Sequence, residues 1–132
     1  MAQSRSDKLK RLVNVQRHLE KMAEIDLAGT TRQRQEVAET MDVVADAIAS
    51  LNPVHRSFSR HYSGQYSRLQ QQDQMLANVQ QMHEMRVVRE RTKADRMEEN
   101  MKEARSAEDR EAADNSIYDL IDQHIAYKQD DD

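Results

Sequence analysis

Five histidines are the residues of this sequence best suited to hold a metal: His18, His55, His61, His83 and His124. None belongs to an HExxH motif, and no two stand four positions apart, the spacing that places two imidazoles on one helix face. No acidic residue lies near His55 and His61 to complete a site. Because His83 and His124 fall in apolar stripes, we expect them to pack in a helix–helix interface, and we expect no metal.

Carboxylates and hydroxyls are equally weak candidates for catalysis. Adjacent carboxylates such as Glu98 and Glu99 are numerous, but paired helices offer no deep pocket that would separate the pKa values of two carboxyl groups. The serine-nucleophile motif GxSxG and the phosphate-binding motifs GxxxxGKS and GxGxxG are absent. We therefore expect a non-enzymatic protein with no cofactor and no small-molecule substrate.

Basic and aromatic residues alternate in one segment, HRSFSRHYSGQYSR at 55–68. Such a mixture can contact phosphates and stack on bases. The net charge of the chain is −4 and no recognition fold accompanies the segment, so we favour aromatic packing at the closed end of a hairpin over nucleic-acid binding. The segment still presents candidate partner-binding residues: Arg56, Phe58, Arg60 and Tyr62.

Composition identifies the elements that must hold these residues. Among 132 residues there are two Gly, one Pro, four Tyr, one Phe, no Trp and no Cys. Sheets need more turn residues and compact cores need more large side chains, whereas this composition is typical of long helices. The lack of Cys excludes disulfides and thiolate metal sites. With no signal-peptide apolar region and no run of 18 apolar residues, we expect no membrane span and a cytoplasmic location.

The only Pro, Pro53, and the second Gly, Gly64, mark a break between two helices. We predict a first long helix within 1–51, capped by Ser6, and a connecting turn at 52–64. A second long helix follows at 65–114, with a short amphipathic helix and an acidic tail at 115–132. The predicted fold class is all-α, a long antiparallel two-helix coiled-coil hairpin.

Apolar residues at steps of three and four predict the faces on which the helices meet. The first helix has two such patches in different registers, which a stutter near 26–36 would reconcile; Gly29 there marks a bend or a close approach of the other helix. Methionines of the second helix can serve both the seam and a partner surface. The predicted seam comprises Leu9, Leu12, Val15, Leu19 and Met22, then Val37, Met41, Val44, Ile48 and Leu51, and on the second helix Leu69, Leu76, Val79, His83, Val87, Ala94, Met97, Met101 and Ala104.

The segment IYDLIDQHIAYK at 117–128 is the most apolar part of the last third of the chain. Asn115-Ser116 resembles a helix N-cap before it, and Ile117, Leu120, Ile121 and Ile125 share one helix face. Two interpretations stay open: the segment packs on the start of the first helix, or it docks in a groove of a partner protein. Residues 97–132 hold twelve acidic and four basic groups, so the two ends suit different partners, and Asp130–Asp132 form a solvated tail.

Two stretches resemble one family. DKLKRLVNVQRHLEKMAEIDLA at 7–28 is similar to the opening of the flagellar and type III secretion export stalk proteins, the FliJ/YscO family, and VVRERTKADRMEENMKEARSAEDREAAD at 87–114 resembles their second helix. The resemblance implies an antiparallel coiled-coil hairpin like the central stalk of rotary ATPases. It also implies that the termini insert into a hexameric export ATPase, and that the loop at 52–64 points toward the export gate, with substrate chaperones as further partners.

Two other functions remain open from the residues alone. One is a structural or adaptor coiled coil that self-associates through its seams and is unrelated to export. The other, less favoured, is a weak nucleic-acid binder acting through the basic segment at 52–68, which has three Arg and no acid.

Overall fold

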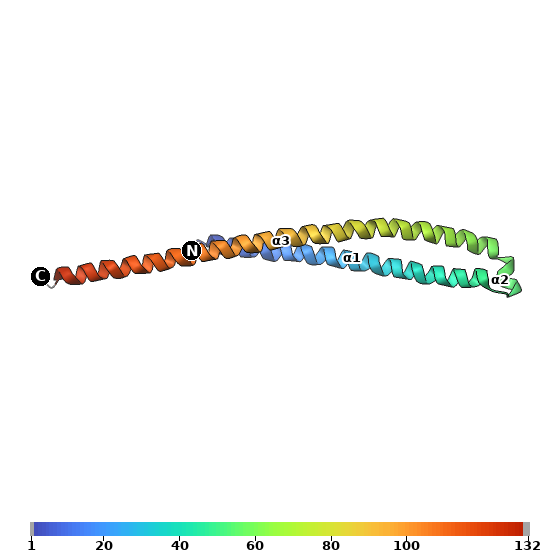
Figure 1. The fold of residues 1–132 in the computed structure, drawn as a ribbon, viewed down its shortest axis with the longest axis horizontal. Coiled ribbons are helices and arrows are strands. Elements are labelled where there is room, and N and C mark those ends of the chain that lie inside the picture. Colours follow the sequence, from blue (N-terminus) through green and yellow to red (C-terminus); the bar gives the residue numbers. More distant parts are fainter. Residues whose placement is uncertain (1, 131–132) are drawn as a thin grey trace. The chain divides into compact units, whose positions relative to one another are not determined.

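The computed structural model describes residues 2–130, which contain three helices and no strand. The helices are α1 (Arg5–Ala49), α2 (Pro53–Ser57) and α3 (Ser59–Asp130), and Figure 1 shows them along the chain. Helices α1 and α3 pack against each other as an all-α helical hairpin, which confirms the predicted fold class. Met1 and the last two residues of the predicted acidic tail, Asp131 and Asp132, lie outside the described residues.

The connection between the long helices is shorter than the predicted turn. Asn52 caps α2, because its side-chain oxygen accepts a hydrogen bond from the Val54 backbone N–H at 3.0 Å, and Pro53 occupies the first helical position, where no N–H is needed. Helix α3 then begins at Ser59, so Gly64 and the second half of the predicted turn are helical.

Helix α3 also continues where a separate terminal helix was expected. Ser116 does not cap a new helix; its hydroxyl donates to the Ala112 carbonyl oxygen at 3.0 Å, as serine does inside a helix. The predicted N-cap of α1, Ser6, is also wrong, because α1 already begins at Arg5. Ser4, not Ser6, accepts the hydrogen bond of the Asp7 backbone N–H, at 3.2 Å, and Ser6 is buried in the seam.

The chain divides into two compact units, and residues up to Arg17 together with those from Thr92 onward form the first. In this unit Ser6 bonds to Glu108, and the Arg17 guanidinium lies 2.8 Å from Asp95 and 2.6 Å from Glu98. Residues further along α1 contact residues earlier in α3, so the two helices run antiparallel.

The second unit comprises His18–Arg91. Its helices are also antiparallel, because Arg91 lies 3.0 Å from Glu20 and Arg86 lies 3.0 Å from Asp26, while α2 joins their ends. The pKa of Arg91 is raised by its hydrogen bonds to Glu20 and Glu24, so the guanidinium stays charged.

One uninterrupted register runs along the covered side of each long helix. Covered positions alternate in steps of three and four, the spacing of a coiled-coil seam, so the stutter predicted near 26–36 does not occur. On α1 the series is Ser6, Leu9, Val13, Gln16, Glu20, Ala23, Leu27, Thr30, Arg34, Val37, Met41 and Val44; on α3 it is Tyr66, Leu69, Asp73, Leu76, Gln80, His83, Val87, Glu90, Ala94, Met97, Met101, Ala104 and Glu108.

This register corrects part of the predicted seam. Most of the first patch on α1 stands one position away from the covered series and is exposed: Leu12 (50%), Val15 (59%), Leu19 (37%) and Met22 (43%). Ile48, Leu51 and, on α3, Val79 are exposed as well. The rest of the prediction for α3, and Leu9, Val37, Met41 and Val44 on α1, is confirmed, with His83 half-buried in the seam.

The core along the seam is narrow and partly polar. Its buried apolar residues are Val13, Ala23, Val37, Val44, Val87 and Ala94, and no large side chain among the described residues is fully buried. Gln16, Glu20 and Thr30 are buried between them. Gly29 makes no close approach, because a Cβ placed there meets no atom within 4 Å, so that interpretation of this glycine is wrong.

Candidate protein-interaction surfaces

The terminal segment, residues 109–130 of α3, is helical and exposed at every position. Its predicted partner-binding residues are all uncovered: Ile117 is 55% exposed, Leu120 65%, Ile121 48% and Ile125 49%. Their spacing brings them to one side of a continuous helix. The alternative in which this segment packs on the start of α1 is therefore wrong, and His124 is exposed rather than in an interface.

Glu108 marks the point where pairing stops. Its carboxylate accepts a hydrogen bond from the Ser6 backbone N–H at 3.0 Å and another from the Ser6 hydroxyl at 2.5 Å. The backbone N–H of Ser6 belongs to the first turn of α1, whose amides have no partner within the helix. These hydrogen bonds lower the pKa of Glu108, the hydroxyl having the larger effect, so a carboxylate of α3 completes the capping of α1.

The tip, residues 50–62, holds the other four predicted site residues. Arg56, Phe58 and Arg60 are exposed, whereas Tyr62 is half-buried. The Tyr62 ring lies 6.0 Å from that of His55 and 6.3 Å from that of Phe58, between ring centroids, and its hydroxyl lies 3.3 Å from His55 Nδ1. Tyr62 therefore packs with its neighbours at the closed end, and the two arginines face solvent.

A third surface consists of exposed methionines on α3, which the sequence predicted only as a mixture of seam and partner surface. In the second unit α3 exposes Met75 (69%), Met82 (68%), Met85 (59%) and Val88 (61%), while Met97 and Met101 are half-buried in the seam. Exposed methionines suit adaptable contacts. A strict heptad register drawn on α3 through Val87 and Ala94 would have placed Met97 and Met101 in the seam and Met82 and Met85 outside it.

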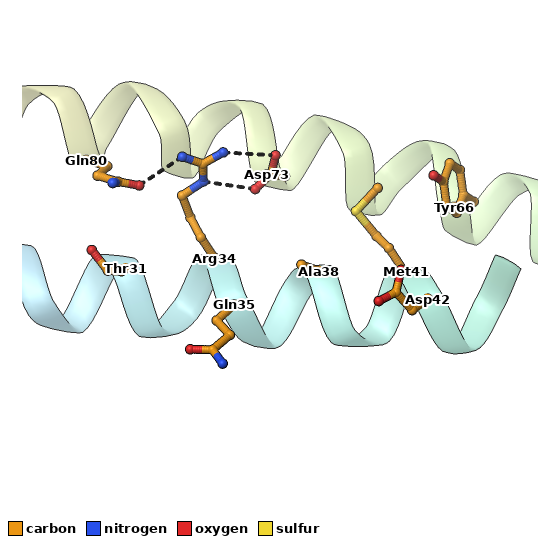
Figure 2. A pocket seen from close by; sticks show the side chains of 9 residues that line it. All are labelled: Thr31, Arg34, Gln35, Ala38, Met41, Asp42, Tyr66, Asp73 and Gln80. Atoms are coloured by element: carbon orange, nitrogen blue, oxygen red, sulfur yellow. Dashed lines mark hydrogen bonds and ion pairs between the residues drawn. The ribbon is translucent and has the colours of Figure 1, made fainter.

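An open hollow of about 490 Å³ lies beside the seam in the second unit, with Arg34 on its wall (Figure 2). The Arg34 guanidinium donates to both oxygens of Asp73, at 3.0 and 3.3 Å, and to Gln80 Oε1 at 2.9 Å. The hydrogen bonds to Asp73 raise the pKa of Arg34 and keep it charged. Since its donors are engaged across the two helices, Arg34 holds the hairpin together rather than awaiting an anionic ligand.

Within residues 2–130, no cluster of three or more His, Asp or Glu side chains is arranged to hold a metal ion. No helix in the same part of the chain has the length and apolar character needed to cross a bilayer. Comparison of the chain with family models, curated proteins and solved structures gives no match.

Proposed function

We propose that this chain is a non-enzymatic coiled-coil interaction protein that docks onto a protein partner through the terminal segment. The observation that carries the proposal is the exposure of four large aliphatic side chains on a helix that no other described element covers. The hairpin up to Glu108 acts as the scaffold that presents this helix.

The chemistry of the terminal segment specifies its partner. Ile117, Ile121 and Ile125 repeat at the spacing of helix-in-groove anchors, and Glu111, Asp114, Asp119 and Asp122 flank them. The complementary surface is an apolar groove with a basic rim. Full burial of an exposed aliphatic side chain contributes about 1.5–3 kcal/mol, so burying the exposed half of these four would contribute about 3–6 kcal/mol in total. Because the segment is already helical, binding loses less conformational entropy than it would with a disordered peptide.

The resemblance to the flagellar and type III export stalk family suggests which partner this is. On that proposal the chain is an export stalk or export chaperone in the cytoplasm, and the groove belongs to the hexameric export ATPase. The tip would then face the export gate. The similarity of residues 7–28 and 87–114 to the two helices of that family supports this more specific proposal, which is an analogy of sequence and architecture.

The test is a pull-down of the tagged chain from its native lysate, with mass spectrometry of the captured proteins. We expect an export ATPase or export-gate protein with the wild-type chain, and loss of that protein with Ile117→Asp/Ile121→Asp. The matched control is Met82→Asp/Met85→Asp, which changes a somewhat more exposed apolar pair outside the terminal segment and should retain capture. Equal loss with both pairs, or no loss with either, would reject the terminal segment as the docking site.

The second candidate function, a self-associating adaptor, is favoured by the exposed methionines on α3. It predicts a dimer in light scattering of the purified wild-type chain and a monomer for the Met82→Asp/Met85→Asp variant. A monomeric wild-type chain at all accessible concentrations rejects this candidate and leaves the docking proposal in place.

A further inference from the structure

The tip combines the most exposed large apolar side chain of the described residues, Leu51, with the longest stretch that lacks acids. Leu51 is 81% exposed, Val54 61% and Phe58 51%, all within eight positions. Side chains of this kind at a loop tip do not help to hold the two helices together. What distinguishes them from the other exposed apolar residues is that they fall together at the closed end, and a group of this kind marks a contact surface.

The charge around these residues has a single sign. Between Asp46 and Asp73 there is no Asp or Glu, whereas Arg56, Arg60 and Arg68 fall in this interval. Arg56 and Arg60 are exposed and form no ion pair with any residue of the described chain. A binding surface complementary to the tip therefore offers negative charge at its face and an apolar layer behind it.

The tip is also ordered before it meets a partner. Asn52 accepts the hydrogen bond of the Val54 N–H, the Ser57 hydroxyl donates to the Val54 carbonyl oxygen at 2.7 Å, and the Phe58 N–H donates to the His55 carbonyl oxygen at 3.2 Å. The ring of Pro53 fixes the φ angle of that residue at the first position of α2. Little conformational freedom remains to be lost when these side chains are buried.

We propose that the tip binds the surface of a membrane that contains anionic lipids. Leu51, Val54 and Phe58 enter the boundary between headgroups and acyl chains, and Arg56 and Arg60 contact lipid phosphates. The combination of aliphatic and basic groups favours lipid over nucleic acid, because Leu51 and Val54 have no face on which a base can stack and Tyr62 is already packed against His55 and Phe58. This inference is independent of the proposed function of the terminal segment.

Co-sedimentation with vesicles tests the proposal. The full chain should bind vesicles of equal parts phosphatidylcholine and phosphatidylglycerol, bind vesicles of phosphatidylcholine alone far more weakly, and release from the anionic vesicles as salt rises. Arg56→Gln/Arg60→Gln should weaken binding roughly 30-fold, because each basic residue near an anionic surface contributes a factor of about five. Leu51→Ser/Val54→Ser should weaken it on anionic vesicles while leaving helicity unchanged, since both side chains are exposed.

The Ile117→Asp/Ile121→Asp variant is the control, and it should bind the vesicles as the wild-type chain does. Loss of binding in that variant would move the membrane contact to the terminal segment and overturn the proposal. Equal binding to neutral vesicles would overturn it too, as would binding to duplex DNA without binding to anionic vesicles.

A fluorescence measurement reports on insertion itself. The chain has no Trp, so Phe58→Trp supplies a single tryptophan, which can be excited at wavelengths that Tyr does not absorb. Its emission should shift to shorter wavelength when anionic vesicles are added. Tyr127→Trp, at an exposed position of the terminal segment, should show no shift. Emission from the tip that stays at the wavelength of water-exposed Trp would overturn the proposal.

Discussion

The two parts of α3 on either side of Glu108 differ in what covers them. Before Glu108 every third or fourth side chain is covered by α1, and the fully covered ones are small: Val87 is 6% exposed and Ala94 0%. After Glu108 stand large aliphatic side chains, Ile117, Leu120, Ile121 and Ile125, and each of these four is at least 48% exposed. The more apolar part of the helix is thus the uncovered part.

Apolar content therefore does not decide which part of this helix is buried. The extent of the opposite helix decides it: α1 begins at Arg5, and Ser6 is the residue that meets Glu108. Small side chains suit the paired region because they let two helices approach closely. Large side chains left beyond the end of the pair are available to another molecule.

A charge placed in each part of α3 should have very different effects on stability. Val87→Asp puts a carboxylate without a partner into the seam, and we expect it to lower the free energy of unfolding by about 3 kcal/mol or more. Leu120→Asp places the same group at a position that is 65% exposed. It should change the free energy of unfolding by less than about 0.5 kcal/mol. Urea unfolding followed by circular dichroism measures both, and similar losses would mean that the terminal segment is covered.

Two adjacent residues of α1 sharpen the same contrast between seam and flank. Val13 is 7% exposed and Leu12 is 50% exposed. Val13→Ala should cost about 1–2 kcal/mol through lost burial and a residual cavity. Leu12→Ala removes a larger side chain but should cost less than about 1 kcal/mol, because much of that side chain already faces water. If Leu12→Ala were the more costly change in thermal and urea unfolding, the seam would follow the register predicted from the sequence.

The sequence predicts the helical class, the helix on either side of Pro53 and the seam on α3, because composition and periodicity report these features directly. It fails at Leu12, Val15 and Leu19, which form a convincing stripe one position away from Val13, Gln16 and Glu20. A local search for apolar residues passes over a seam position filled by Gln or Glu. Only the continuity of the register along α1, and the ion pair of Glu20 with Arg91, shows that these polar residues lie inside.

The candidate surfaces were predicted only in part, because the sequence pattern shows which residues share a face but not whether another helix covers that face. Sequence periodicity identified the apolar face of Ile117, Ile121 and Ile125, but it could not show whether α1 reached far enough to cover it. The separate helix expected at Asn115-Ser116 was wrong because Asn and Ser are tolerated inside a helix that already runs through both flanks. The exposed methionines of α3 were predicted as a mixture of seam and surface, and only burial separates Met82 from Met97.

The glycines offer a stabilising change within the paired region. A Cβ at Gly29 or at Gly64 meets no atom within 4 Å, and both residues lie inside helices. Gly29→Ala should therefore raise the free energy of unfolding by about 1 kcal/mol, since Ala restricts the unfolded chain and favours the helix. Gly64→Ala should add a similar increment near the tip. A loss of stability in urea unfolding of Gly29→Ala would show that α1 needs a bend at this point.

The boundary between the two parts of α3 is itself sensitive to pH. The pKa of Glu108 is lower in the folded chain than in the unfolded chain because Ser6 donates two hydrogen bonds to the carboxylate. The Glu108 carboxylate therefore contributes its full stabilisation of the fold at a pH above the pKa of the unfolded carboxyl group, about 4.3. This stabilisation is lost as the pH falls through the lower pKa that Glu108 has in the folded chain. Glu108→Gln should be less stable than the wild-type chain at neutral pH, and the gap should narrow in acid.

Glu111→Gln, in the exposed terminal segment, is the matched control for Glu108→Gln because it removes the same charge three residues further along α3. Unfolding by urea at a series of pH values, from neutral to about pH 3, should show a narrowing gap for the first variant and little difference at any pH for the second. Hydrogen exchange at the first turn of α1 should accelerate only in Glu108→Gln, because the Ser6 amide loses a charged acceptor. Parallel behaviour of the two variants would mean that pairing does not end at Glu108, and the contrast between the two parts of α3 would have to be redrawn.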